Sequence, residues 1–517
     1  MEPVAGRAID GERPMMDSKT RTRLFDSKLF RSALPALLAL ACAAPEVVID
    51  PVEVPAKPQN ILLLFADDMR PDTIAAWGND SIATPNLDRL VEDGFSFRQA
   101  YNLGSVHGAV CMPSRAMLHT GLPYFGMNLS TFNDHSTLGQ LLQQADYHSF
   151  GTGKWHNGRD TFSRSFEEGQ SIFFGGMSDH NYVPLTDLSS AGYGPDRTGD
   201  AHSSELFADA AVSFLDNYKE DDPFFCYVAF TAPHDPRDPP AEFMHPYRDV
   251  SPPLPANFLP QHPIDNGFLR VRDEKLAAWP RTEHVVGEQL AEYYALIAHL
   301  DSQIGRILDA LESCGRLDNT LVVFAADHGL AMGSHGLLGK QNLYEHSIGM
   351  PLVLSGPGVP RGGTTNAQVY LHDVFATVLT RAGVEVPAGR MSRDLMPICT
   401  GDTSTVRTQL GFSMGSTIRA LRDDHWKLIR YPKIDRTQLF DLSQDPDELN
   451  DLAALPEHRD RIDVMLSNLR VWQNTVADTQ TLTATELMPA EVDLTGAERN
   501  PDRWQPQWIR EKYFDPQ

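Results

Sequence analysis

Three stretches of the chain are almost entirely apolar, which is the pattern of strands buried on both faces of a parallel sheet. They are residues 60–66 (NILLLFA), 224–230 (FFCYVAF) and 320–326 (TLVVFAA). Segments with apolar residues at helical spacing lie between and around them and predict helices. These helices cover residues 84–92, 138–145, 205–217 and 288–314. Strands that alternate with helices predict an α/β fold with a large, mainly parallel sheet sandwiched by helices.

The pattern changes after about residue 405. Short amphipathic strands follow, with the sequences QLGFSMG, STIRALRDD and WKLIRYP, and a helix is predicted over residues 457–477. We therefore predict a smaller C-terminal subdomain with an antiparallel sheet and a covering helix. The predicted division is residues 1–57 as an export signal and Pro-rich linker, 58–404 as the main domain, and 405–517 as this subdomain.

The N-terminal region predicts export from the cytoplasm. Residues 32–44 (SALPALLALACAA) form an apolar run after a basic stretch. The run is shorter than the about 20 residues that a membrane-spanning helix needs. The LALAC sequence that ends at Cys42 resembles the cleavage box of bacterial lipoproteins. We expect an exported protein, periplasmic or extracellular, whose membrane contact is limited to a lipid anchor at Cys42; the alternative is an uncleaved N-terminal helix.

Charge and cysteine content exclude two classes of protein. The 517 residues carry a net charge of −25, so no overall basic field attracts nucleic acid. The five cysteines have neither the spacing of a disulfide framework nor that of a zinc site. An anionic ligand would therefore need a local group of cations, or a metal ion, to overcome the repulsion of the acidic chain.

Acidic residues follow two of the apolar strands directly. Asp67 and Asp68 follow residues 60–66, and Asp327 and His328 follow residues 320–326. Ligands of open α/β sheets bind at the carboxyl ends of the strands. Taken singly, an acid in this position more often caps a turn, but two such pairs favour a metal site. Because carboxylate oxygens dominate, the expected ion is Ca²⁺, with Mg²⁺ as the alternative.

The most informative motif is CMPSRAMLHTG, residues 111–121. It resembles the C-x-P-S-R…T-G signature of the sulfatase family, and His119 is its one departure from the usual Leu or Met. The resemblance implies an alkaline-phosphatase-like fold. It also implies that a formylglycine-generating enzyme oxidises Cys111 to formylglycine, whose hydrate is the nucleophile and a metal ligand. Pro113 suits the first turn of a helix, which places Cys111 near a helix N-terminus that favours anions, with Arg115 one turn along to hold an oxyanion.

Further resemblances to this family extend over residues 58–450. GKWH contains Lys154 and His156, TAPHDPRDPP contains His234, and HGLLGK ends at Lys340. Taken singly, each would be an ordinary loop residue. The resemblance implies that the two lysines bind the sulfate and that His234 protonates the leaving alcohol, a task that suits an imidazole. It implies that His156 hydrogen-bonds the hydrate and acts as the base that restores the aldehyde.

The resemblance predicts a sulfatase, most simply one that acts on a sulfated carbohydrate, with choline sulfate and aryl sulfates left open. Asp327-His328 stands where the family commonly has Asp-Asn and resembles the iduronate-sulfatase-like branch. Two other functions remain: a phosphonate monoester or phosphodiester hydrolase of the same superfold, and a non-catalytic exported glycan-binding protein. For the substrate pocket we predict Asp179, His180 and Arg237.

Overall fold

The computed structural model describes residues 59–494, 497, 501 and 505–514. The predicted export signal, the linker and Cys42 lie outside the described residues. Within the described residues, no helix combines the length and the apolar character that crossing a membrane requires.

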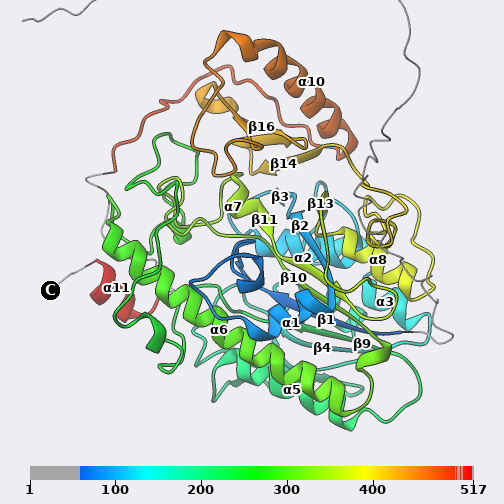
Figure 1. The fold of residues 1–517 in the computed structure, drawn as a ribbon. Helices are drawn as coiled ribbons and strands as arrows, with labels where there is room; N and C mark the ends of the chain where they lie inside the picture. Colours follow the sequence, from blue (N-terminus) through cyan, green and yellow to red (C-terminus); the bar gives the residue numbers. More distant parts are fainter. Residues whose placement is uncertain (1–58, 495–496, 498–500, 502–504, 515–517) are drawn as a thin grey trace, which may run out of the picture. The chain divides into compact units, whose positions relative to one another are not determined.

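Strand β1 (Asn60–Ala66) lies near the middle of a 12-stranded sheet, between β10 (Thr320–Ala326) and β9 (Phe224–Ala229) (Figure 1). All residues of these three strands are buried, as their apolar sequences predict. The predicted bounds of β1 and β10 match the structure, and β9 ends one residue earlier than predicted.

The centre of this sheet is parallel, and an antiparallel strand borders this centre on each side. Its strands follow the order β11-β2-β12-β10-β1-β9-β4-β5-β6-β7, with β13 paired to β2 and β8 paired to β6. Strands β10, β1, β9, β4 and β5 are parallel, while β12 and β6 pair with the two ends of this group in the antiparallel sense. The remaining bounds are β2 (Gly94–Tyr101), β4 (His148–Lys154), β5 (Glu168–Phe173), β6 (Pro184–Ser189), β7 (Gly192–Tyr193), β8 (Arg197–Thr198), β11 (Gly349–Met350), β12 (Leu352–Ser355) and β13 (Gly363–Tyr370).

Helices flank the large sheet (Figure 1). Helices α1 and α5 each pack against α6, and α2, α3 and α8 form a second group. The long helix α6 begins five residues before the predicted start. Thr282 caps it by accepting a hydrogen bond from the Val285 amide. The helices are α1 (Pro85–Asp93), α2 (Cys111–Thr120), α3 (Leu138–Gln143), α4 (Arg159–Ser165), α5 (Ser203–Asn217), α6 (Glu283–Ser313), α7 (Glu345–Ile348), α8 (Asp373–Arg381), α9 (Met396–Cys399), α10 (Arg459–Thr475) and α11 (Gln507–Tyr513).

A second, smaller sheet has five strands in the order β17-β16-β15-β14-β3, and helix α10 packs on it. Four of its strands are antiparallel, as predicted for the C-terminal subdomain. The fifth, β3 (Gly104–Ser105), comes from the main domain and pairs in parallel with β14. The small sheet is therefore completed by a segment far outside residues 405–517. Its other bounds are β14 (Leu410–Met414), β15 (Ile418–Arg422), β16 (Trp426–Tyr431) and β17 (Arg436–Asp441).

Candidate active site

The register between β1 and β10 brings the predicted acidic pairs together. Ala66 pairs with Ala326, so both strands end at the same level of the sheet and the next residues, Asp67 and Asp327, lie side by side. Asp68 has a left-handed backbone (φ 65°), which costs a residue other than glycine roughly 1–2 kcal/mol. Two hydrogen bonds hold it there: its amide donates to Asp327 Oδ1 (2.9 Å), and the Tyr293 hydroxyl donates to its carbonyl (2.6 Å).

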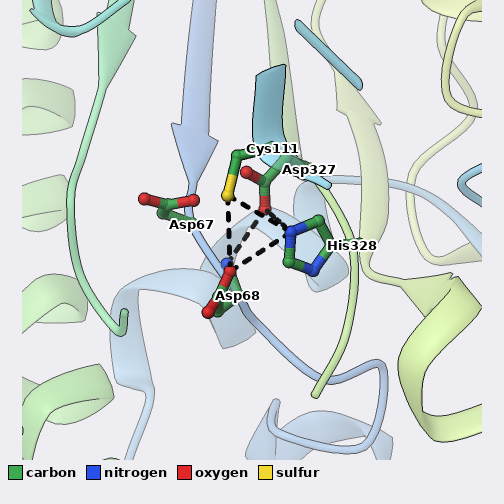
Figure 2. A group of neighbouring side chains, drawn as sticks. All are labelled: Asp67, Asp68, Cys111, Asp327 and His328. Carbon is green, nitrogen blue, oxygen red and sulfur yellow. Dashed lines mark hydrogen bonds and ion pairs between the residues drawn. The ribbon is translucent and has the colours of Figure 1, made fainter. Parts of the chain in front are cut away.

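Cys111 is the first residue of α2, within one position of its predicted place, and its side chain points into the acidic cluster (Figure 2). Its Sγ lies 3.4 Å from His328 Nε2 and 3.8 Å from Asp68 Oδ1. The five residues predicted to bind the metal each offer a ligand atom, and these atoms all lie within 4.8 Å of one another. The structure therefore assembles this predicted set from three separate segments of the chain.

The donor set of this cluster fits a divalent cation. Asp67 Oδ1 and Asp327 Oδ2 are buried and accept no hydrogen bond. Buried carboxylate oxygens without donors are costly, and a hard cation that prefers oxygen would satisfy them. Burial and the neighbouring Asp67 raise the pKa of Asp327 well above its ordinary value. At Asp67 burial acts in the same direction, but Lys154 and the other neighbouring groups together outweigh it and hold the pKa of that carboxyl well below its ordinary range.

Three cations surround the carboxylates. Lys154, the last residue of β4, forms an ion pair with Asp67. Lys340 Nζ lies 2.7 Å from Asp68 Oδ1 and 3.4 Å from the sulfur of Cys111. Burial alone would lower the pKa of Lys340, but Asp68 together with Cys111, Asp273 and Asp67 outweighs it and raises that pKa well above its ordinary value. Lys340 therefore stays charged inside the protein.

Arg115 lies behind the carboxylates and not on the side from which a ligand enters. Its Nη2 is 3.6 Å from both Asp67 and Asp327, and its Nη1 donates to the Lys154 carbonyl (2.6 Å). The side chain is fully buried and does not line the neighbouring cavity. The structure thus brings Arg115 into the cluster, but in a place where it balances charge and orients the acids rather than contacting a substrate.

Two histidines border the cluster on its open side. His156 follows β4 and lines the cavity, and its buried Nδ1 takes part in no hydrogen bond. His234 follows β9; its Nδ1 is 2.7 Å from the Asp235 carbonyl, and its Nε2 is 3.7 Å from Asp68 Oδ2. Burial lowers the pKa of both imidazoles well below the ordinary value, and neighbouring lysines lower it further. Both rings are therefore neutral before a ligand binds.

A cavity of about 610 Å³ leads from the cluster to the surface. Its inner end holds Cys111, His156, His234 and Lys340. We call the rest of its lining the outer pocket, which consists of Gly108, Ala109, Gly176, Met177, Val271, Arg272, Asp273 and Gln341. The four inner residues were all predicted from the sequence. Those of the outer pocket were not.

The three residues predicted for the substrate pocket do not line this cavity. His180 is buried, and its two ring nitrogens lie 2.9 Å from the Ser203 hydroxyl and 3.0 Å from the His234 carbonyl. Arg237 points inward and donates to Gln289 (3.0 Å), and Asp179 lies outside the lining. The prediction was wrong because the side chains of His180 and Arg237 are buried against partners inside the protein, and the sequence does not show on which side of a loop a side chain lies. His180 instead supports the backbone of the loop that carries His234.

Fold and site together define a class of protein: an enzyme with a mainly parallel α/β fold, whose buried acidic cluster could hold a cation beside three basic side chains at the ends of the parallel strands. A profile of the sulfatase family matches residues 59–384, well over half of the chain. The chain belongs to the sulfatase family and is a sulfuric ester hydrolase. A second profile, described as the C-terminal part of N-sulphoglucosamine sulphohydrolase, matches residues 333–475.

Relatives with assigned names agree with this family. The chain is 26% identical to an N-acetylglucosamine-6-O-sulfatase of Bacteroides thetaiotaomicron, over 82% of this chain and 87% of the relative. It is 28% identical to a choline-sulfatase of Rhizobium meliloti, over 77% and 83%. A solved structure in complex with its substrate D-glucosamine-2-N,6-O-disulfate has the same fold, with a TM-score of 0.70, 23% identity and coverage of 82% of this chain and 99% of that one.

Proposed function

We propose that this sulfatase removes a sulfate group from a sulfated carbohydrate, using a formylglycine formed from Cys111 and a calcium ion at the ends of β1 and β10. One observation carries the proposal. The sulfur of Cys111 lies 3.4 Å from both His328 Nε2 and Lys340 Nζ, at the inner end of a cavity and beside the acidic cluster. A reacting group on residue 111 would thus face the cation site and the entering ester at once.

Two groups would be added to the folded chain. Asp67, Asp68, Asp327 and His328 would hold the calcium ion, with residue 111 as a further ligand, and the ion would supply positive charge to the sulfate oxygens. Formylglycine, as its hydrate, would supply an oxygen nucleophile and a second hydroxyl that releases the sulfate. Assignment of the site to the iduronate-sulfatase-like branch, from Asp327-His328, stays a prediction.

The charges of the cluster explain how an acidic protein can bind an anion. Three carboxylates face three cations, which are Asp67, Asp68 and Asp327 against Arg115, Lys154 and Lys340. These charges cancel, so a divalent ion would leave an excess of positive charge that a sulfate ester neutralises. Lys340 borders the cavity and would contact the sulfate directly. Lys154, now paired with Asp67, would turn toward the sulfate once the ion satisfies that carboxylate.

The histidines supply the proton transfers. His234 lies at the cavity beyond the cluster. The negative charge of a bound sulfate ester would favour its protonated form, which would then give its proton to the oxygen of the departing alcohol. His156 lies on the same cavity, and its unpartnered Nδ1 is available for the hydroxyl of the hydrate. It would take the proton that must leave when the aldehyde is restored.

A carbohydrate fits the remaining features best. The cavity of about 610 Å³ is within the range of small-molecule sites, and it mixes apolar and hydrogen-bonding groups in its outer pocket. The relative named N-acetylglucosamine-6-O-sulfatase and the fold neighbour bound to a sulfated glucosamine support the same class. We further propose export to the periplasm or the outside, where such substrates occur, and maturation by a formylglycine-generating enzyme.

Mass spectrometry of the tryptic peptide from Gln99 to Arg115 tests the nucleophile. We expect an aldehyde in place of the thiol when the chain is expressed with a formylglycine-generating enzyme, and reaction of that peptide with a carbonyl reagent. An unmodified thiol in fully active enzyme would overturn this part of the proposal.

A desulfation screen tests the substrate class. The screen compares defined sulfated mono- and disaccharides with p-nitrophenyl sulfate, choline sulfate and p-nitrophenyl phosphate. We expect the highest kcat/KM on a sulfated sugar. A clear preference for the phosphate ester would favour a phosphoryl-transfer enzyme of the same superfold. A preference for choline sulfate would overturn the proposal that the substrate is a carbohydrate.

A further inference from the structure

The C-terminal segment of the chain, residues 505–514, reaches the loop that carries His234. Gln505 donates a hydrogen bond from Nε2 to Asp235 Oδ2, and the same nitrogen lies 3.8 Å from the sulfur of Met177 in the outer pocket. Gln505 and Asp235 are 270 positions apart in the sequence, and both are buried. The segment lies beyond residue 475, where the second family profile ends.

Helix α11 anchors this segment on the first half of α6 (Figure 1). Lys512 Nζ lies 2.6 Å from Glu292 Oε1, and the Tyr513 hydroxyl donates to Glu292 Oε2 (2.6 Å). Ile509, Tyr513 and Phe514 form an apolar cluster of their own against this part of the molecule. Two hydrogen bonds to a buried carboxylate, together with this apolar contact, fix the position of Gln505.

Asp235 connects Gln505 to the outer pocket. Its Oδ2 accepts from Gln505 and from Arg272 Nη1 (3.1 Å), so the two donors share one oxygen. Arg272 lines the cavity, and its Nη2 lies 3.2 Å from His234 Nε2. The guanidinium therefore stands where the alcohol part of a bound ester would lie, next to the histidine assigned to that alcohol.

We infer that the C-terminal segment is a specificity-determining part of the active site, in which Gln505 is a positioning residue that holds Arg272 through Asp235. This inference rests on the proposed function. It makes Arg272 a contact for the sugar from which the sulfate is removed. Asp235 and Asp273 balance its charge, and its two terminal nitrogens already donate to Asp235, Asp273 and Met177. Arg272 is therefore a fixed, planar wall of the pocket against which the sugar packs, rather than a receptor for a second anion. A smaller aryl leaving group makes less contact with this wall.

Kinetics of the full-length chain on two substrates test this inference. Gln505→Ala removes the contact directly, and Ile509→Ser loosens α11 without touching the site. We expect both variants to raise KM for the best sulfated sugar about fivefold, the equivalent of one hydrogen bond, while p-nitrophenyl sulfate kinetics stay unchanged. Gln507→Ala is the matched control, because this exposed side chain bonds only to Glu511, and we expect it to behave as wild type.

A double-mutant cycle separates positioning from a general loss of structure. If Gln505 acts through Arg272, Gln505→Ala has no further effect on the sugar KM in an Arg272→Ala background. Additive effects, an equal loss on both substrates, or no loss on either would overturn the inference. Failure of wild type on every sulfated sugar would instead overturn the proposed substrate class. The inference is then decided by p-nitrophenyl sulfate against the larger 4-methylumbelliferyl sulfate, where only a selective loss on the larger ester supports it.

Discussion

Two aspartates with no exposed surface, Asp327 and Asp373, lie in very different surroundings. Asp373, at the start of α8, accepts four hydrogen bonds. The donors are the Tyr370 amide (2.8 Å), the Arg393 amide (2.8 Å) and the two terminal nitrogens of Arg407 (2.5 and 2.7 Å). Asp327 accepts one hydrogen bond on Oδ1, and its Oδ2 accepts none.

The difference separates a structural carboxylate from one that needs a ligand. At Asp373 the burial cost is offset within the protein, because every oxygen has two donors and the charge has a bidentate arginine. At Asp327 the nearest cation, Arg115, stays 3.6 Å away, and burial together with Asp67 raises the pKa of the carboxyl. Burial alone therefore does not mark a functional acid. A buried carboxylate oxygen that lacks hydrogen-bond donors, in a cluster beside a cavity, does mark one. This is the reason to expect an ion at the ends of β1 and β10.

The largest expected effect is on activity, when Cys111 beside the acidic cluster is replaced. Cys111→Ala removes the precursor of the nucleophile, so we expect kcat/KM to fall by roughly 10⁴-fold or more while the thermal unfolding midpoint changes little. Cys399→Ala changes another buried cysteine, in α9 and outside the cluster, and should keep full activity. Substantial activity in the Cys111 variant would mean that the cluster has another role.

Asp327→Asn tests the ligand role of the incomplete carboxylate. We expect a loss of roughly 10³-fold in kcat/KM, because the substitution removes one ligand of the ion and half of the carboxylate oxygens at that point. Without added calcium, the variant should be at least as stable as wild type, since asparagine carries no charge that burial disfavours. Denaturant unfolding in the presence of a chelator measures this. If the variant is much less stable than wild type in the presence of the chelator, Asp327 is a structural carboxylate like Asp373.

Asp373→Asn is the reciprocal change. It breaks a buried bidentate pair and leaves Arg407 without its partner, so the free energy of unfolding should fall by about 3–5 kcal/mol. The kcat/KM of the folded fraction should stay close to that of wild type, because Asp373 is not part of the cluster or the cavity. Urea unfolding and active-site titration of the soluble protein check the two halves of this prediction separately.

The sequence revealed the incomplete site more readily than the rest of the pocket. The apolar runs of β1 and β10 end at acids, and that local pattern alone placed Asp67, Asp68 and Asp327 at one edge of the sheet. The family signature then supplied Cys111. Both patterns are short and continuous in the sequence, so they can be recognised without knowing the fold.

The outer pocket has no such local pattern. Arg272 and Gln505 meet at Asp235 from 37 and 270 positions away, and neither belongs to a recognisable motif. Nothing in their neighbours in the sequence indicates which way they point. The same is true of His180, which was predicted for the substrate pocket and does not line it. The start of α6 was also predicted five residues too late. Gly287, a poor helix former, stands directly before the predicted start, although the helix already begins at Glu283 behind the Thr282 cap.

The smallest expected effect is on wild-type stability when calcium is removed. An ion that binds only the folded chain stabilises it by about 2.7 kcal/mol at a concentration one hundred times its Kd. We therefore expect a chelator to lower the melting temperature of wild type and of Asp373→Asn by similar amounts, and to leave that of Asp327→Asn unchanged. Differential scanning calorimetry with calcium, magnesium and chelator measures all three. A chelator effect that survives in Asp327→Asn would place the ion elsewhere, and the two buried aspartates would then differ for a reason other than metal binding.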